Sequence, residues 1–306
     1  MIRVIWNPVS GRGRGARLHA AVRTAFAAQG ITDFQATTAP GDEAHLVHQA
    51  LDDGVATIVA VGGDGTWGKC AVALAKAGSP ARIAFVAAGT GNDFAKNLRA
   101  PAHNLHAMAQ LIAGGGVERR VDLGRVDDAW FANVAGLGFD VAALRAATRV
   151  RFLRGSSVYV VAALRELFDF PGLEARVQGM AGVDPQPMLR RLMLVIANGK
   201  EFGGAFRIAP EARVDDGRLD AVLFADGIRA GRLPLLARAL VGTHLKHPAV
   251  ASATGTSFTI TCRNRPWLEL DGELHQATSE AITVACVPGA LRVLDTSDAS
   301  RARPGS

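Results

Sequence analysis

Residues 57–77 read TIVAVGGDGTWGKCAVALAKA. The stretch opens with an apolar, β-branched run, continues with three glycines within four positions, and ends in an alanine-rich pattern from Trp67. A strand, a glycine-rich turn and a helix in this order are typical of a parallel α/β sheet, in which ligands bind beyond the carboxyl ends of the strands. The stretch therefore predicts an α/β domain with a ligand-binding turn.

The same alternation of short strands and longer helices extends from Ile2 to about Arg125. The expected strands are residues 2–6, 34–38, 57–61, 82–86 and 119–123, and the expected helices are residues 15–29, 42–53 and 67–77. Asp42 is expected to cap its helix, because its carboxylate can accept from free amides of the first turn.

After Arg125 the pattern changes to closely spaced β-like runs, at residues 130–134, 174–178, 189–197, 219–224, 257–262, 266–270 and 281–287. Short strands of this kind predict a sandwich or barrel, here interrupted by helical stretches at residues 141–168 and 232–245. A last run, residues 291–294, is expected to return to the first domain. The predicted organisation is an α/β domain of residues 1–124 with a returning segment at about 288–298, a β-sandwich domain of residues 125–287 and a disordered tail of residues 299–306.

The composition fits a globular protein with anionic partners. Hydrophobic residues make up 49% and aromatic residues 6% of the chain, and so few aromatic rings argue against binding of single-stranded nucleic acid. The net charge of +6 favours phosphates or acidic lipid headgroups. Cys70, Cys262 and Cys286 lack a CxxC spacing and are expected to be reduced. Because neither a signal-peptide pattern nor an apolar run of about 20 residues is present, we expect a cytoplasmic protein with peripheral membrane contact.

The turn at residues 61–66 carries the most specific chemical signal. Its glycines let consecutive amides converge on phosphate oxygens, and a carboxylate planted among them would repel the phosphate unless a divalent cation lay between. Asp64 therefore predicts a magnesium ion, with a helix N-cap as the alternative role. Lys69 lies three residues beyond Thr66, so the turn is not a Walker A loop.

A second glycine-rich turn, NPVSGRGRG at residues 7–15, follows the first strand. Asn7 and Ser10 in this turn are candidate nucleotide contacts, and free amides at the start of the next helix would attract phosphate. The spacing up to Ala16 also matches the dinucleotide pattern GxGxxA, with Asp33 as a candidate ribose ligand. A helix start without any ligand is the alternative.

A third turn, AGTGNDFA at residues 88–95, follows the strand that ends near Val86. Thr90 could supply a hydroxyl to the same triphosphate, whereas Asn92 and Asp93 are equally suited to cap the next helix. Because all three turns follow strands of one parallel sheet, we expect them to line a single crevice.

Together these motifs resemble the catalytic domain of the diacylglycerol kinase family, and more closely its soluble bacterial lipid kinases, over nearly the whole chain. The resemblance depends on six segments in family order: NPVSGRG from Asn7, GGDGTWG from Gly62, GTGNDFAKNL from Gly89, VDLGRV from Val121, FANVAGLGFDV from Phe131 and LDGEL from Leu270. GGDGT alone would also suit NAD kinases and phosphofructokinases, whereas GTGNDFA and LDGE favour the lipid kinases.

The resemblance implies an α/β ATP-binding domain, a β-sandwich domain and an active site in the cleft between them. The implied reaction is ATP- and magnesium-dependent transfer of the γ-phosphate to a hydroxyl of diacylglycerol or a related lipid. Asp64 and Asp122 would hold the catalytic magnesium, and Glu273 would accept the proton of the lipid hydroxyl. The implied nucleotide contacts are Thr37, Gly62, Gly63, Asp64, Gly65, Thr66, Trp67, Gly68 and Thr90.

The residues around Glu273 point to the same role. Asp271 and Glu273 are separated by one glycine, so in an extended segment both carboxylates point to one face, while Gly272 leaves space for substrate. The alternative is that Asp271 and Gly272 form a hairpin turn between strands. The resemblance favours the extended, catalytic interpretation.

The chain departs from the family pattern in two places. Ala87 and Ala88 precede the third turn, where the family usually has a proline. The family's structural magnesium site is matched by VDDGR at residues 214–218, in which Asp216 and the carbonyl of Arg218 could serve. Arg213 stands where an oxygen-bearing side chain is expected and cannot ligate a cation, so this site needs Asp215 or water instead.

Two basic segments could contact an anionic membrane, or else form solvated helix faces. The first carries Arg145, Arg149, Arg151, Arg154 and Arg165, and the second carries Arg232, Arg238, His244, Lys246 and His247. The expected partners are a hydroxyl lipid and an anionic membrane surface, with no nucleic acid, and a homodimer is left open.

Two other functions compete with the lipid kinase. One is an NAD kinase, and the other is a catalytically silent module that binds a nucleotide or a lipid. Asp64, Asp122 and Glu273 together argue against the silent module, because a mere binder has little need for a metal carboxylate and a base.

Overall fold

The computed structural model describes residues 1–89, 91–98, 104–150, 165–180 and 187–297. The chain divides into two compact units, Met1–Leu123 with Pro288–Ser306, and Gly124–Val287. Several residues discussed above lie outside this description, namely Thr90, the side chains of Arg149, Arg151 and Arg154, much of the helical stretch 141–168, and the tail 299–306.

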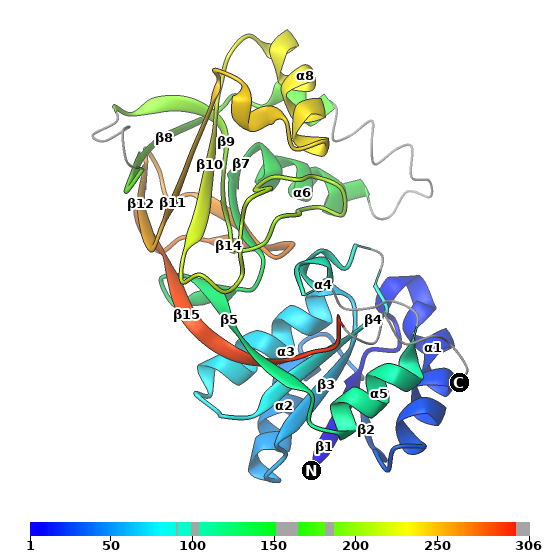
Figure 1. The fold of residues 1–306 in the computed structure, drawn as a ribbon. Coiled ribbons are helices and arrows are strands. Elements are labelled where there is room, and N and C mark those ends of the chain that lie inside the picture. The colour runs from blue at the N-terminus through cyan, green and yellow to red at the C-terminus, as the bar shows by residue number, and fades with distance from the viewer. Residues whose placement is uncertain (90, 99–103, 151–164, 181–186, 298–306) are drawn as a thin grey trace. The chain divides into compact units, whose positions relative to one another are not determined.

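The first unit is a parallel sheet with helices on both faces (Figure 1). Its strand order is β15-β4-β3-β1-β2, and each neighbouring pair is parallel. Helices α2 and α3 lie together on one face, and α1 and α5 on the other. The bounds are β1 Ile2–Trp6, α1 Ser10–Ala27, β2 Asp33–Ala36, α2 Asp42–Asp52, β3 Thr57–Gly62, α3 Asp64–Lys76, β4 Arg82–Ala87, α4 Asp93–Asn97, α5 Leu105–Ala113 and β5 Val117–Val126.

Strand β3 lies in the middle of this sheet, and all six of its residues are buried. A parallel strand covered on both faces reads as a continuous apolar run rather than an alternating one, which is why TIVAV decides the fold class. Val59 and Val61 pack in one apolar cluster with Phe26 from α1 and Ile112 from α5. The helices are therefore held to the sheet by their aliphatic faces.

Two helices of the first unit begin earlier than the sequence predicts, and the predicted N-cap at Asp42 is wrong. Helix α1 begins at Ser10 and α3 at Asp64, so Gly11, Gly13 and Gly65 lie in the first turns of helices instead of preceding them. Asp42 does not cap α2, because its carboxylate accepts from the amides of Thr38 and Ala39, at 2.7 and 2.8 Å. Since Asp42 is the first helical residue, its side chain points back toward the preceding loop.

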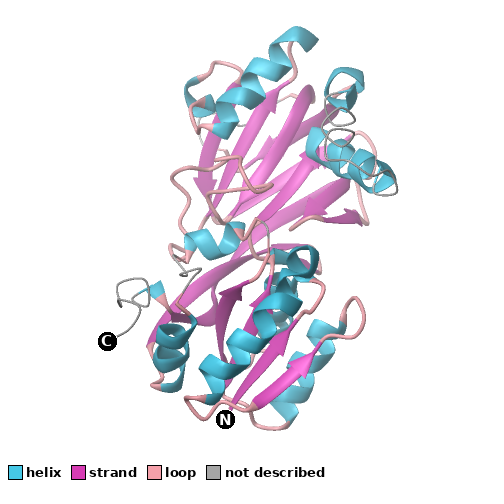
Figure 2. Ribbon diagram, turned by 90° about the vertical axis from the view of Figure 1, so that its right-hand side faces the viewer, coloured by secondary structure: helices cyan, strands magenta, loops and turns pink. Residues whose placement is uncertain are grey.

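The second unit is an antiparallel, β-rich domain (Figure 2). Its strands run in the order β14-β13-β7-β9-β8-β12-β15, and β10 pairs with both β9 and β11. The bounds are β6 Ala129–Phe131, β7 Val134–Gly138, α6 Phe139–Val150, β8 Leu173–Gln178, β9 Leu189–Ala197, β10 Leu219–Ala225, α8 Arg229–Leu240, a 3-10 helix η1 His244–Lys246, β11 Val250–Gly255, β12 Ser257–Cys262, β13 Trp267–Leu270, β14 Glu273–Gln276 and β15 Ala281–Asp295.

Two apolar clusters stabilise the second unit. One includes Leu194 and Ile260, and the other includes Val195 and Phe224, so neighbouring residues of β9 enter different clusters. Successive side chains of a strand point to opposite faces, and β9 therefore has apolar packing on both. The expected fold class, an α/β domain joined to a β-sandwich domain, is confirmed.

Four strand assignments differ from the sequence-based prediction. Residues 130–134 contain the end of β6 and the start of β7, and β11 and β14 were not expected. The runs 281–287 and 291–294 form one strand, β15, although Pro288 and Gly289 between them resemble a turn signal. Gly289, with a φ of 56°, lies where β15 leaves β12 and before it pairs with β4.

The described residues contain no helix that is long and apolar enough to cross a membrane.

Candidate active site

The three glycine turns meet at the carboxyl ends of β1, β3 and β4. A Cβ on Gly11 would overlap the carbonyl oxygen of Ala88, and a Cβ on Gly89 would lie 2.5 Å from the Cα of Gly63. The Arg14 guanidinium donates to the Gly89 carbonyl at 3.1 Å. Only glycine permits such close approach of backbones, so each turn is shaped to fit its neighbour. The turns are thus brought together as the sequence predicts.

Asp64 stands at the junction of the second and third turns. Its Oδ1 accepts from the amide of Phe94 at 3.1 Å, whereas the N-cap of α3 is Gly63, which makes no side-chain cap. The carboxylate therefore reaches across to the start of α4 and does not cap its own helix. Burial raises the pKa of Asp64, amides of the third turn lower it, and the nearby Asp93 raises it.

This donor set suits a magnesium ion. A half-desolvated carboxylate beside a second acid gains from a cation, and Mg²⁺ typically takes one or two carboxylates and completes its shell with phosphates and water. Among the described residues no group of three or more His, Cys, Asp or Glu side chains could hold a metal without such help. Asp122 is 3% exposed, and its Oδ1 accepts from the Gly289 amide at 2.7 Å.

The other predicted nucleotide contacts differ in how they are held. The Asn7 amide donates to the Thr66 hydroxyl at 3.1 Å, and the Ser10 hydroxyl donates to the Asn7 carbonyl at 2.9 Å. Thr37 is buried, and its amide donates to the Trp6 carbonyl at 3.0 Å. The glycines Gly62, Gly65 and Gly68 lie in β3 or the first turns of α3.

Two expectations about this edge need correction. The Trp67 side chain is fully buried and stacks on Phe94 with ring centroids 4.2 Å apart, so only its backbone could contact a nucleotide. Asp33 cannot serve as a ribose ligand here, because it begins β2, at the end of the sheet opposite the glycine turns. There it forms an ion pair with Arg3 at 2.7 Å.

The Asp271–Gly272 pair forms a hairpin turn, and the prediction of an extended segment is wrong. Leu270 pairs with Glu273 across the turn, and φ is 49° at Asp271 and 88° at Gly272. Two positive φ values are what a tight hairpin between twisted strands requires, and Asp followed by Gly tolerates them. The local signal outweighed the inference from the family pattern.

The Asp271 carboxylate binds backbone amides. It accepts from Ala132, Asn133 and Val134 at 2.5, 2.9 and 3.0 Å, and so ties the hairpin to the loop between β6 and β7. Glu273, the first residue of β14, is exposed. The turn therefore presents Glu273 to solvent while Asp271 fixes the position of the turn.

Sequence reasoning missed two buried acids beneath this hairpin, Glu269 and Asp140, which are 3% and 6% exposed. A Cβ on Gly136 would overlap Asp140 Oδ2 and lie 3.1 Å from Glu269 Oε2. Among the described atoms neither of these two oxygens has a hydrogen-bond partner. Glu269 Oε1 accepts from the amide of Gly272, so the pair adjoins the turn.

Both acids are held toward their protonated form. Burial raises the pKa of Asp140 to about 7. Burial, followed by the charge of Asp140, raises the pKa of Glu269 well above its usual range. The sequence carries no signal of this pair, because an acid between two leucines of a short strand is expected on the solvent face.

The segment proposed for a structural magnesium site has its own contacts. Asp216 accepts from the Arg218 amide at 3.0 Å. Asp215, the substitute ligand, lies 3.5 Å from the Arg213 guanidinium, with which it forms an ion pair. The ion pair with Arg213 therefore engages the carboxylate of Asp215, the residue that would have to serve as metal ligand in place of Arg213.

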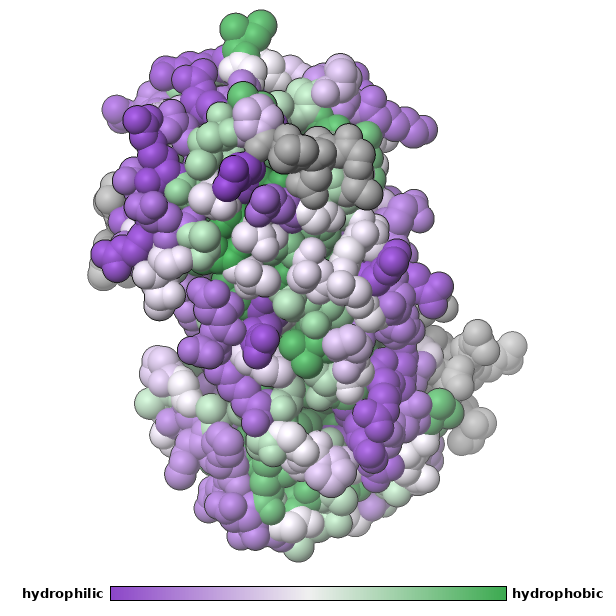
Figure 3. Space-filling view, turned by 90° about the vertical axis from the view of Figure 1, so that its left-hand side faces the viewer, coloured by the Kyte–Doolittle hydropathy of each residue, from purple (hydrophilic) through white to green (hydrophobic). Residues whose placement is uncertain are grey.

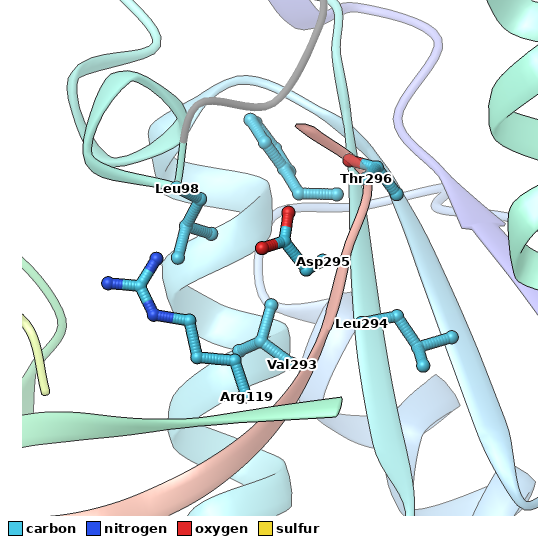
Figure 4. Close-up of a pocket in the computed structure, with 7 residues that line it drawn as sticks. Leu98, Arg119, Val293, Leu294, Asp295 and Thr296 are labelled. Carbon is cyan, nitrogen blue, oxygen red and sulfur yellow. The ribbon is translucent and has the colours of Figure 1, made fainter. Parts of the chain in front are cut away.

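Figure 4 shows a small hollow in the first unit, between β4, α4, β5 and β15. Leu98, Val293 and Leu294 supply apolar walls, and Arg119 and Asp295 supply charge. It has room for about one water molecule, and we assign it no ligand.

A parallel sheet whose glycine turns converge around a carboxylate, joined to a β-sandwich domain, defines an enzyme of the kinase class. Residues 1–126 match the model of the diacylglycerol kinase catalytic domain. Residues 133–295 match that of the YegS C-terminal NAD kinase beta sandwich-like domain. The chain belongs to the diacylglycerol kinase family and is a lipid kinase.

Individual relatives agree with this assignment. A "Probable lipid kinase YegS-like" protein of Xanthomonas oryzae is 33% identical, with 85% of each chain covered. A "Diacylglycerol kinase" of Mycobacterium tuberculosis is 27% identical, with 96% of this chain and 94% of the relative covered. The crystal structure of a diacylglycerol kinase from Bacillus anthracis has the same fold, with a TM-score of 0.72, 19% identity and 96% of each chain covered.

Proposed function

We propose that the protein transfers the γ-phosphate of ATP, with Mg²⁺, to a hydroxyl of diacylglycerol or a related lipid. The observation that carries the proposal is Asp64, a half-buried carboxylate among three converging glycine turns. Backbone amides of such turns bind phosphate oxygens, and a carboxylate beside them calls for a cation. The family membership and its curated relatives supply the lipid acceptor.

The residues would divide the work between the two units. In the first unit the turn amides would hold the triphosphate, and Asp64 with Asp122 would hold the metal. Bound Mg²⁺ would neutralise the charge of the phosphate oxygens, which is the larger part of catalysis in phosphoryl transfer. In the second unit Glu273 would accept the proton of the lipid hydroxyl, with Asp271 fixing the hairpin that carries it. The lipid acceptor would bring the enzyme to a membrane surface.

The test is a transfer assay with γ-labelled ATP. Purified protein is incubated with Mg²⁺ and either a total lipid extract, diacylglycerol in detergent micelles, or NAD. We expect label in the organic phase and dependence on Mg²⁺. Label in NADP would replace the lipid kinase with an NAD kinase, and label in neither product would favour a silent module.

The role of Glu273 is tested by Glu273→Gln, which removes the base and keeps the size of the side chain. Turnover should fall by at least about 100-fold, the usual contribution of a general base, while ATP binding stays unchanged. Glu280→Gln, at another exposed glutamate of the same unit, is the matched control and should keep full activity. A Glu273→Gln enzyme with wild-type turnover would refute the assignment.

A further inference from the structure

Helix α8, Arg229–Leu240, buries one of its three arginines and exposes several apolar side chains. Arg232 is 3% exposed and lies in the interior, 2.8 Å from the fully buried carboxylate of Asp226. Leu233 and Leu240, in contrast, are 46% and 43% exposed, and Val241 just beyond the helix is 63% exposed. The inward face also carries Leu235, Leu236 and Ala239, so the helix differs from an ordinary surface helix in that its outward face is apolar as well.

The exposed residues form one continuous stripe. Positions three, four and seven apart share a helix face, and the outward face consists of Ala230, Leu233, Pro234, Ala237, Leu240 and Val241. It contains no charged residue, and Ile228, 85% exposed, extends it at the start of the helix. Figure 3, seen from the other side of the second unit, shows an apolar group projecting among hydrophilic ones at the end of the unit where Figure 1 draws α8. We call this stripe, with Ile228, the α8 face.

The border of the α8 face is cationic. Arg229 and Arg238 are exposed on its two sides, and Lys246 is exposed shortly beyond it. Residues 227–268 contain no Asp or Glu, and the preceding acid, Asp226, is buried and paired with Arg190 and Arg232. Of the second basic group named above, Arg232 and His244 are buried, so they do not belong to this border.

An apolar stripe bordered by cations matches one kind of partner. Apolar side chains that enter the headgroup boundary gain by burial, and flanking arginines gain from anionic lipids, so the two effects add at the surface of an anionic bilayer. A positive border without acids also excludes a basic protein surface. We propose that the α8 face is the surface by which this protein docks on anionic membranes. The proposal rests on the proposed function only in that a lipid acceptor requires contact with a bilayer.

The test is sedimentation of the full chain with vesicles of phosphatidylcholine, with and without about one third phosphatidylserine. We expect binding to the anionic vesicles that weakens with salt, because the arginine contribution is screened. The variant Leu233→Gln with Leu240→Gln should bind at least about tenfold more weakly, since it removes apolar surface without changing the charge. Val117→Gln, at a residue 68% exposed in the first unit, is the matched control and should bind like the wild type.

Equal binding of the double glutamine variant and the wild type would overturn the proposal, as would equal binding to neutral and anionic vesicles. Wild-type protein that remains in the supernatant with both vesicles would also overturn it. Activity on diacylglycerol in detergent micelles separates this inference from the proposed function, because micelles need no docking on a bilayer. If the docking proposal and the proposed function are both correct, the double variant should keep its activity on micelles. A wild-type protein that phosphorylates no lipid in micelles would count against the proposed function alone.

Discussion

Asp140 and Glu269 are two acids that the fold buries in the second unit, each with one oxygen beside Gly136 and, among the described residues, no hydrogen-bond partner for that oxygen. Two ionised carboxylates in one buried site repel strongly in an interior of low dielectric, so one of them keeps its proton. The other oxygen of Glu269 accepts from the Gly272 amide, so the pair is also tied to the hairpin. Asp271 is the other charge that acts on the pair.

The pair makes stability depend on pH. The pKa of Asp140 rises to about 7 in the folded chain, above the ordinary pKa of an aspartate. Between these two values the folded chain keeps a proton on Asp140 that the unfolded chain has released. Stability therefore falls as pH rises through this window and levels off above it. Asp140→Asn keeps the shape of the side chain and removes its proton release, so the dependence on pH should weaken to what Glu269 contributes. At pH 8 the expected gain in stability is a few kcal/mol, from ~1.4 kcal/mol per pKa unit.

Thermal midpoints from pH 4.5 to 8 measure this effect. The Asp140→Asn midpoint should exceed the wild-type midpoint at pH 8 and approach it at the acidic end. Asp169→Asn, at an exposed residue of the same unit, should follow the wild-type curve. Parallel curves for wild type and Asp140→Asn would show that Asp140 is ionised in the folded chain.

At the scale of elements, the fit of turn to turn matters more than any single ligand. The second and third turns touch through Gly63 and Gly89, and the first turn touches the third through Gly11 and Ala88. Sequence patterns predict each turn, because each is a local strand-to-helix junction. They do not predict which glycines are needed for contact, since the contact joins residues 26 positions apart (89 − 63).

Gly89→Ala tests this contact. The added Cβ would lie 2.5 Å from the Gly63 Cα and 2.7 Å from Asn92 Oδ1, so the two turns must separate. Overpacking of this kind costs about 1–3 kcal/mol, and ATP affinity should fall at least tenfold, to be measured by calorimetric titration. Gly65→Ala adds its Cβ where no atom lies within 4 Å and should leave the stability unchanged or about 1 kcal/mol higher. Equal stability of the two variants would contradict the contact.

At the scale of the whole molecule, the end of the chain completes the core of its beginning. β15 pairs with β12 of the second unit at its start, and with β4 of the first unit at Arg292 and Val293. Leu294, 2% exposed, belongs to the same apolar cluster as Val4 and Phe26. The first unit therefore needs residues from both ends of the sequence.

Leu294→Ala should destabilise the first unit by about 2–5 kcal/mol, because it leaves a cavity in a core whose other residues, such as Val4 and Phe26, come from the start of the chain. Hydrogen exchange measured by mass spectrometry should accelerate in the peptides of β1 and β3. Leu189→Ala, at a residue 45% exposed, is the control and should change stability by less than about 0.5 kcal/mol. Unchanged exchange in β1 would contradict the role of the returning strand.

Local patterns alone determined the α/β nature of the first unit, its glycine turns, the β-rich second unit and the family. Each of these depends on residues close in the sequence, such as the run from Thr57 to Val61 or the pair Asp271–Gly272, whose hairpin tendency proved correct. Only the tertiary structure decided that Asp64 binds the start of α4, that Asp271 holds the loop before β7, and that Asp140 and Glu269 share a buried site. The reason is physical: these contacts join residues from 30 to 139 positions apart, and burial, which sets their charge, exists only once distant segments pack.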